Sequence, residues 1–210
     1  MSQAPRQGLL FIVSAASGTG KTSLVHALLA QDGNLAVSVS HTTRPRRPGE
    51  QEGTDYHFVT PAKFQEMAER GDFLEDADVF GNRYGTSRAT VDEQLRSGVD
   101  IILEIDWQGA RQVRSAYPEA ASIFILPPSR AALVQRLQGR GLDAADVIQA
   151  RSHKAREEIS HYGDYDYLVV NDEFATALAE LTQIIAARRL ALRPQAQQLE
   201  SLLDDLLREQ

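Results

Sequence analysis

The sequence contains no cysteine among its 210 residues, which excludes disulfide bridges and thiolate metal sites and is typical of a protein of the reducing cytosol. It also lacks any run of about 18 apolar residues, so no membrane-spanning helix is predicted. Residues 1–7 are mostly polar and include no apolar segment of signal-peptide type. We therefore expect a cytoplasmic protein without a membrane partner.

The sequence also has fewer basic than acidic residues: 22 are Lys or Arg and 29 are Asp or Glu, which gives a net charge of -7. A protein that coats nucleic acid needs a broad basic face, so nucleic acid is not expected as a partner. The basic residues gather in two stretches, 44–47 and 136–156. Such local concentration is suited to a pocket for a small polyanion.

Apolar runs alternate with helical patterns along the chain, which predicts an α/β fold with a parallel sheet flanked by helices. Continuous apolar runs, typical of strands buried on both faces, occur at 9–13, 99–106, 122–126 and 167–170. Short strand signals over 72–86 predict a small β-rich insert, and a further strand is expected over 36–40. Thr60, followed by Pro61, and Ser129 are expected to cap helices.

A phosphate-loop pattern follows the first apolar run, with Ala15 at the position where the usual motif has Gly. The pattern is Ala15-Ala16-Ser17-Gly18-Thr19-Gly20-Lys21-Thr22. Its glycines allow successive N–H groups to face a phosphate, and the next helix directs its positive N-terminus at the same anion. Lys21 is expected to reach the β and γ phosphates of a nucleoside triphosphate, and the Thr22 hydroxyl to bind Mg²⁺.

Two acidic residues end the apolar run at 101–106. Glu104 and Asp106 are two apart, so their side chains share a face of the strand at its carboxyl end, where ligands bind in parallel sheets. We expect Asp106 to hold Mg²⁺ through water and Glu104 to orient the metal or the acceptor. The alternative for Asp106 is a cap on the next helix.

Several further segments occur in a fixed order with these motifs. They are Ser40 to Glu50, Gly53 to Phe58, Phe73 to Glu75, Gly81 to Thr86 and Glu104 to Gly109. Together with the phosphate loop they resemble the motifs of guanylate kinases, and the resemblance covers residues 8–188. It implies a P-loop nucleoside monophosphate kinase of purine metabolism that moves the γ-phosphoryl group of Mg-ATP to GMP.

The resemblance also implies a GMP site. Its members are Ser40, Arg44, Arg47, Tyr56, Glu75, Tyr84, Thr86 and Asp106. The two arginines lie on a proline-flanked loop, and guanidinium groups bind phosphate by paired hydrogen bonds. The tyrosines can donate to the same phosphate, and Glu75 can accept from guanine N1–H and the 2-amino group. The hydroxyl groups of Ser40 and Thr86 can form hydrogen bonds with O6 or with the guanine ring. The family often has Ser at the position of Thr86.

A second basic segment resembles the lid of the family, whose arginines close over the transferring phosphoryl group. Its arginines here are Arg136, Arg140 and Arg151, which join Lys21 and Arg44 as catalytic candidates. Asn171 matches a position near the adenine of ATP. The implied division is a core of residues 8–35, 97–130 and 165–188, a GMP-binding insert over about 36–96 and a lid over about 136–160.

The C-terminal residues 194–210 predict an amphipathic helix. Its apolar stripe consists of Leu199, Leu202, Leu203, Leu206 and Leu207. An apolar stripe on a terminal helix is expected to be buried, either on the body of the protein or against a second copy of the chain. The second arrangement would form a homo-oligomer through this helix.

Two other functions remain open from the sequence. A kinase of the same fold with another acceptor, such as a ribosyl phosphate, would not need the guanine-edge carboxylate of Glu75. A non-catalytic scaffold of guanylate-kinase type that binds phosphopeptides would not need Lys21, Thr22 or the lid arginines. All of these residues are present.

Overall fold

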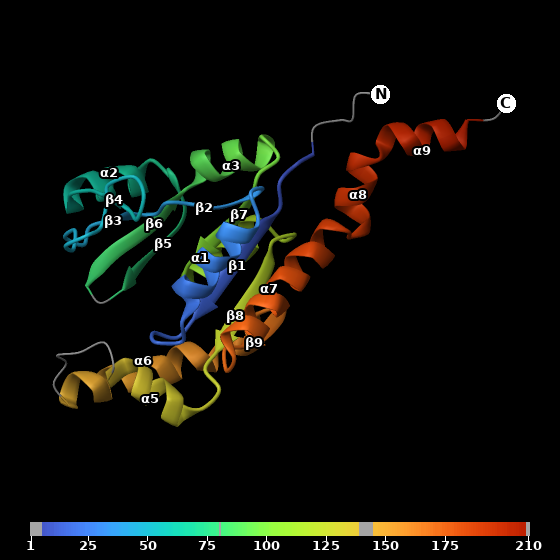
Figure 1. Ribbon diagram of the computed structural model, residues 1–210. Coiled ribbons are helices and arrows are strands. Elements are labelled where there is room, and N and C mark those ends of the chain that lie inside the picture. Colours follow the sequence, from blue (N-terminus) through green and yellow to red (C-terminus); the bar gives the residue numbers. More distant parts are fainter. Residues whose placement is uncertain (1–5, 80, 139–144, 209–210) are drawn as a thin grey trace.

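The computed structural model describes residues 6–79, 81–138 and 145–208, and for 145–152 it describes the backbone alone. Its centre is a five-stranded parallel sheet in the order β2-β7-β1-β8-β9, with helices on both faces (Figure 1). The strands are β1 (Leu10–Ala15), β2 (Leu35–Val37), β7 (Asp100–Glu104), β8 (Ala121–Leu126) and β9 (Tyr167–Val170). The predicted α/β architecture is confirmed.

The strands of this sheet are mainly apolar because both faces of its central strands are covered. Phe11 and Val13 pack beneath α1 (Lys21–Gln31) and α7 (Phe174–Arg189), in one apolar cluster. Leu10 and Ile12 alternate with them and pack on the opposite face, beneath α3 (Arg88–Arg96) and α4 (Trp107–Ala116). Burial on two sides explains why the sequence shows continuous apolar runs here instead of alternation.

A second, four-stranded mixed sheet forms the predicted β-rich insert, in the order β4-β3-β6-β5. Its strands are β3 (His41–Thr42), β4 (His57–Phe58), β5 (Phe73–Val79) and β6 (Asn82–Ser87). The helix α2 (Pro61–Glu69) covers it, with Phe64 stacked on Phe73 at 4.5 Å between ring centroids. Thr60 caps α2 by accepting a hydrogen bond from the Lys63 N–H, as predicted.

The strand expected over 36–40 is present but shorter than predicted, because the chain leaves the central sheet before it reaches the insert. β2 ends at Val37 in the central sheet, and β3 begins at His41 in the insert. The Ser38 N–H still donates to the Ile102 carbonyl, so the backbone leaves the central sheet after Ser38. A pattern of apolar residues reports burial, and it does not tell which of two sheets buries a residue.

Two further helices, α5 (Arg130–Gln138) and α6 (Ala145–Ser160), lie below the central sheet in Figure 1. Ser129 caps α5 through the Ala132 N–H, as predicted. Leu133, Leu137 and Ala155 form a small apolar cluster with Ala16 of the phosphate loop. These helices therefore pack directly on the loop. A short 3₁₀ helix (Tyr162–Asp164) leads from α6 to β9.

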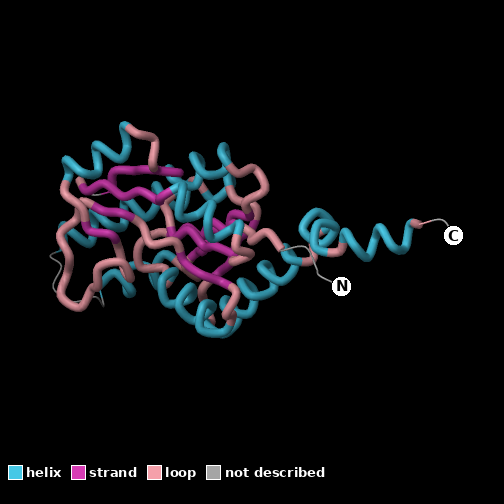
Figure 2. Tube along the Cα trace, turned by 90° about the horizontal axis from the view of Figure 1, so that it is seen from above, coloured by secondary structure: helices cyan, strands magenta, loops and turns pink. Residues whose placement is uncertain are grey.

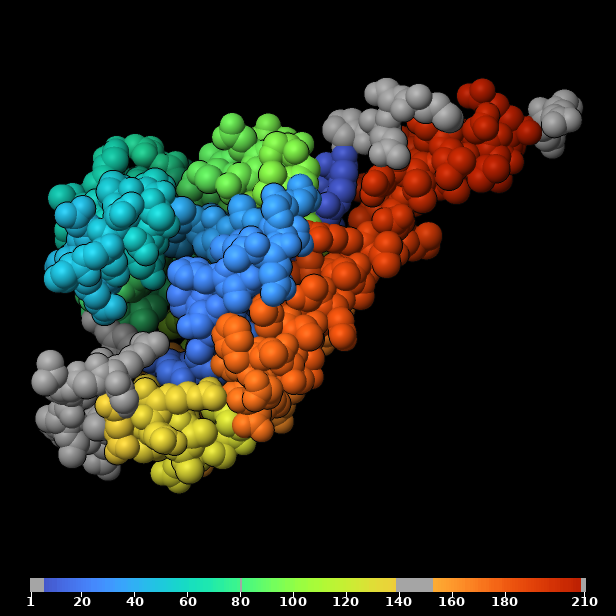
Figure 3. Space-filling model, in the orientation of Figure 1, coloured from blue at the N-terminus to red at the C-terminus, as the bar shows by residue number. Residues whose placement is uncertain are grey.

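The chain ends in α8 (Leu192–Gln198) and α9 (Glu200–Leu207), which extend away from the body (Figure 2, Figure 3). Leu206 and Leu207 of α9 are 69% and 79% exposed. Of the two arrangements expected for the leucine stripe, the structure does not show packing on the body. Within the described ranges, no helix combines the length and apolar character needed to cross a membrane.

Candidate active site

The phosphate loop lies between β1 and α1, in the predicted order of strand, loop and helix. Gly18 and Gly20 have φ angles of 86° and 96°, a left-handed conformation that other residues resist. Gly20 is also closely approached, because a Cβ there would lie 2.5 Å from Asn171 Nδ2. The loop is closed on itself by Thr19, whose N–H and hydroxyl both donate to the Ala16 carbonyl.

Two of the predicted site residues support the loop from outside. Asn171 Nδ2 donates to the Thr19 carbonyl at 2.7 Å, and Arg136 Nη1 donates to the same oxygen at 3.2 Å. Arg136 Nη2 also donates to the Asn171 carbonyl at 3.0 Å. These bonds hold the Thr19 peptide in one orientation, so Arg136 and Asn171 shape the loop in this structure.

Glu104, at the end of β7, contacts both predicted chemical groups of the loop. Lys21 Nζ lies 3.0 Å from Glu104 Oε2, and the Thr22 hydroxyl donates to the same oxygen at 3.2 Å. The contact arises because β7 pairs directly with β1, which places the ends of the two strands side by side. Asp106 instead caps α4, since its Oδ1 accepts from the Gly109 N–H at 2.9 Å.

This donor set fits a magnesium ion. Hydroxyl and carboxylate oxygens are the ligands that Mg²⁺ prefers, and kinase sites complete its shell with substrate phosphates and water. Thr22 and Glu104 supply one oxygen of each kind, already within 3.2 Å of each other. In the described part of the chain, no group of three or more His, Cys, Asp or Glu side chains is placed to hold a metal. A pair supplemented by nucleotide phosphates does not need such a group.

The acceptor side begins at Arg44, whose guanidinium forms two hydrogen bonds with Glu50, at 2.7 and 3.1 Å. This pairing is the main reason that the pKa of Arg44 is raised. The guanidinium carbon lies 5.3 Å from the centroid of the Tyr56 ring, and that ring packs edge-on against Tyr84 at 5.8 Å. Three predicted phosphate ligands therefore converge. Arg47 donates its backbone N–H to Glu50, and its side chain is exposed.

The predicted base-reading residues also come together. Glu75 is only 4% exposed, and its Oε1 accepts from the Thr86 hydroxyl at 2.6 Å. The Ser40 hydroxyl lies 3.4 Å from that of Thr86. Burial raises the pKa of Glu75 to about 7, and the negative charge of Asp106 adds to this effect. The site thus holds a carboxyl group that is costly to ionise without a partner.

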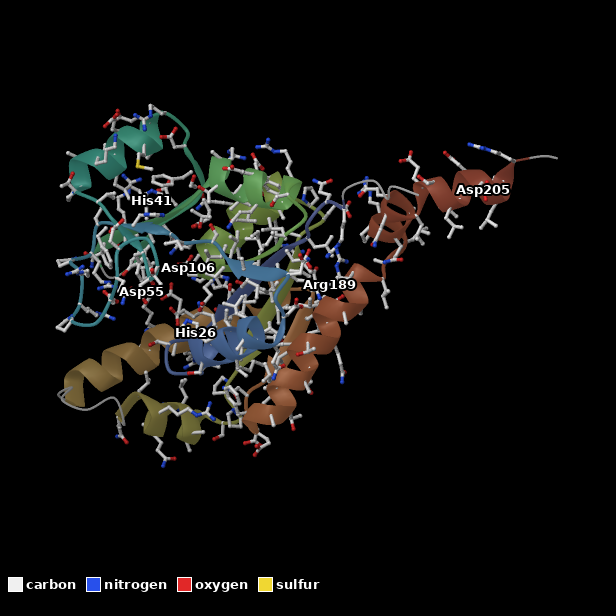
Figure 4. The ribbon with its side chains drawn as sticks, turned by 45° about the horizontal axis from the view of Figure 1, so that its top comes forward. His26, His41, Asp55, Asp106, Arg189 and Asp205 are labelled. Atoms are coloured by element: carbon white, nitrogen blue, oxygen red, sulfur yellow. The ribbon has the colours of Figure 1, made fainter. Side chains whose placement is uncertain are left out.

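Figure 4 shows Asp106 between the insert, which carries His41, and α1, which carries His26. Burial is the main cause of the raised pKa of both Glu75 on the insert and Glu158 beside the phosphate loop, and the negative charge of Asp106 raises both pKa values further. Among the predicted lid arginines, Arg140 lies outside the described residues. The backbone of Arg151 belongs to α6, and its side chain is not described.

Three residues of the site were not assigned a role from the sequence. Glu50 holds Arg44, and Glu158 accepts a hydrogen bond from the Ser17 N–H at 3.2 Å. Gly109 leaves room for Glu75, because a Cβ at Gly109 would lie 2.5 Å from Glu75 Oε2. Glu50 and Gly109 fall within the motif segments, which is a usable signal. Glu158 is 141 residues from its partner, and no local pattern indicates that contact.

Comparisons with known proteins agree with this geometry. Residues 7–188 match the family model described as guanylate kinase. A guanylate kinase of Hahella chejuensis is 57% identical over 204 residues, which are 97% of this chain and 98% of the relative. One of Saccharophagus degradans is 57% identical over 200 residues, covering 95% and 98%.

A solved structure gives the same result. The guanylate kinase of Anaplasma phagocytophilum superimposes with a TM-score of 0.76 and is 33% identical. The match covers 95% of this chain and 96% of that one. Both kinds of similarity extend over nearly the whole length of the proteins compared. The chain therefore belongs to the guanylate kinase family.

Proposed function

We propose that the chain is an ATP:GMP phosphotransferase, which moves the γ-phosphoryl group of Mg-ATP to GMP and yields ADP and GDP. One observation carries the proposal. A phosphate loop and a separate site of arginine, tyrosines and a buried carboxyl group meet at the end of β7. There Glu104 contacts Lys21 and Thr22 of the loop, and Asp106 accepts from the N–H of Gly109, which has no room for a Cβ beside Glu75. Two adjacent anion-binding sites are what a donor and an acceptor phosphate require.

The donor half acts by positioning and charge neutralisation, since phosphoryl transfer needs little covalent help from the protein. The loop N–H groups and the N-terminus of α1 face the triphosphate, and Lys21 neutralises charge on its β and γ phosphates. Thr22 and Glu104 would hold Mg²⁺, with Asp106 predicted to assist through water. When bound, the ion withdraws charge from the β and γ oxygens.

The acceptor half holds GMP at both ends. Arg44 gives two of its five N–H donors to Glu50 and one to the Pro45 carbonyl, and the remaining donors are available to the GMP phosphate, with the Tyr56 and Tyr84 rings nearby. Glu75 accepts from guanine N1–H and the 2-amino group, and these donors replace the water that burial removes. Arg136, Arg140 and Arg151 are predicted to neutralise charge on the transferring group.

An assay that couples ADP release to a colour change tests the proposal. ADP should form only when ATP, Mg²⁺ and GMP are all present, and Lys21→Ala should not form it. ADP release with a different phosphorylated acceptor would instead indicate the related kinase. Absence of turnover combined with phosphopeptide binding would indicate the scaffold.

Self-association through α9 belongs to the same proposal. Leu202, Leu203, Leu206 and Leu207 are all at least 40% exposed, so the stripe is available to a second copy of the chain. The mass measured by solution scattering should exceed that of the 23.2 kDa monomer. A monomeric mass at high protein concentration would contradict it. The cytoplasmic location and the absence of a nucleic-acid partner stay predictions.

A further inference from the structure

Glu158, in the last turn of α6, is a carboxylate for which the transfer reaction described above has no use. Its Oε2 accepts the hydrogen bond from the Ser17 N–H at 3.2 Å, which joins α6 to the phosphate loop. The side chain is partly buried, and burial is the main reason that its pKa is raised. Asp106 and Glu157 raise it further, whereas the Ser17 bond and Lys154 favour the ionised form.

The contact falls at the apex of the loop. The turn from Ala16 to Thr19 is closed by the Thr19 N–H and hydroxyl, both of which donate to the Ala16 carbonyl. Gly18 lies against Leu137, because a Cβ there would be 3.0 Å from Leu137 Cδ2. Ser17 is thus held by a polar bond to α6, whereas the next residue, Gly18, packs against apolar side chains of α5. Loss of that bond would leave the orientation of the Ser17 peptide unfixed.

The end of α6 is anchored elsewhere as well. Ala155 is buried in the apolar cluster that includes Ala16, and His161, just beyond the helix, stacks on Trp107 with 3.7 Å between ring centroids. Trp107 is the first residue of α4 and directly follows Asp106. The last turn of α6 therefore spans from the phosphate loop to the helix that Asp106 caps. Glu158 makes the polar contact at the loop end of this span.

We propose that Glu158 is a positioning residue for ATP, which orients the apex of the phosphate loop by accepting the Ser17 N–H and thereby couples α6 to the triphosphate. The inference rests on the proposed function. Since the GMP site is built on the insert, the effect of Glu158 falls on ATP and spares GMP. What matters at this position is an acceptor oxygen at the right reach.

Four variants test this idea. Glu158→Ala removes the acceptor, and Glu158→Asp keeps the charge on a side chain one methylene shorter. Glu158→Gln keeps an acceptor oxygen at full reach. Glu157→Ala is the matched control, because Glu157 is the preceding residue of the same helix and is exposed.

We expect Glu158→Ala and Glu158→Asp to raise the KM for ATP about tenfold, the upper range for loss of one hydrogen bond. The KM for GMP should stay within about twofold, as one bond at the loop apex does not reach the insert. Glu158→Gln and Glu157→Ala should resemble the wild type. If Glu158→Ala does not fold, the Asp and Gln variants still make the comparison.

Hydrogen exchange of the Ser17 amide, followed by NMR on the free protein, gives a second readout that does not need turnover. Exchange should quicken in Glu158→Ala and Glu158→Asp and stay unchanged in Glu157→Ala. If the wild type has no GMP-dependent activity, the proposed function is wrong. The exchange rate of the Ser17 amide would still show whether Glu158 fixes the phosphate loop. Unchanged Ser17 exchange, equal effects on both KM values, or a Gln variant as impaired as Ala would each overturn the inference.

Discussion

The two regions that we propose to bind phosphate are built in different ways. The donor region uses backbone N–H groups and a helix N-terminus, all from residues 15–22. The acceptor region uses side chains, Arg44, Tyr56 and Tyr84, which three separate segments of the insert bring together. In both regions a glutamate already holds the main cation, Glu104 for Lys21 and Glu50 for Arg44.

The difference has a physical consequence. A backbone site depends on conformation, so glycines at two positions matter, and among the loop side chains only Lys21 and Thr22 are predicted to act on the phosphates or the metal. A side-chain site depends on which groups the fold brings close, so single substitutions can remove one contact and leave the rest. Substitutions in the two regions should therefore affect different kinetic constants.

The largest effect is expected for Lys21→Ala on the donor side. Removal of a cation that stabilises the transition state should lower kcat by at least about 10²–10³-fold. GMP affinity should change little, because Lys21 does not belong to the acceptor region. Steady-state kinetics with calorimetric GMP binding measures both. Near-normal kcat in this variant would refute the mechanism.

Glu75 should make stability depend on pH. The pKa of Glu75 in the folded protein is about 7, above the usual 4.5. Its contribution to the free energy of unfolding is therefore fully present below pH 4.5 and is lost as the pH rises through about 7. The free energy of unfolding of the wild type should therefore fall by ~3 kcal/mol relative to Glu75→Gln between about pH 4.5 and pH 8. Urea unfolding at the two pH values measures this, with Glu69→Gln as the exposed control. Parallel curves for wild type and Glu75→Gln would show that the carboxyl group titrates normally.

Arg44→Ala should act on the acceptor region alone. Loss of charged hydrogen bonds to the GMP phosphate, each worth roughly 1.5–3 kcal/mol, should raise the KM for GMP more than tenfold. The KM for ATP should hardly change. Arg46→Ala, an exposed neighbour on the same loop, serves as the control. If the wild type bound guanosine and GMP with equal affinity, the Arg44 site would not bind the GMP phosphate.

The smallest kinetic effect is expected from deletion of residues 195–210, which touches neither region. Because α9 extends from the body with its leucines exposed, the deletion should lower the mass of an oligomer and leave turnover per chain unchanged. Solution scattering and the ADP assay test the two parts. If the truncated protein has the same number of chains per particle and the same melting temperature as the full chain, the leucine stripe has no role in association or stability.

Much of the fold could be predicted because burial on both faces leaves a clear mark in sequence. The apolar runs near residues 9–13 and 122–126 are β1 and β8, within two residues at each end. The helix caps at Thr60 and Ser129 were predictable because capping is local chemistry. The two-residue strand β3 was harder to predict, since a strand so short carries almost no periodicity.

The site divides in the same way. The phosphate loop could be read from spacing, whereas the acceptor residues needed a family resemblance to be grouped. The capping of α4 by Asp106 is local chemistry and was one of the two alternatives that the sequence offered. The contact of Glu104 with Thr22 depends on how far β7 extends beside β1. The Glu158 contact with Ser17 and the closeness of Gly109 to Glu75 depend on tertiary packing alone.

The most direct test of the account is whether Glu75 makes the acceptor guanine. A carboxylate accepts hydrogen bonds and guanine offers two donors on one edge, whereas adenine presents a lone pair and a C–H there. We predict that kcat/KM for AMP is about 10⁴-fold below that for GMP, with IMP between them, and that Glu75→Gln narrows the gap. Equal kcat/KM for AMP and GMP in the wild type, or unchanged ratios in Glu75→Gln, would contradict the account.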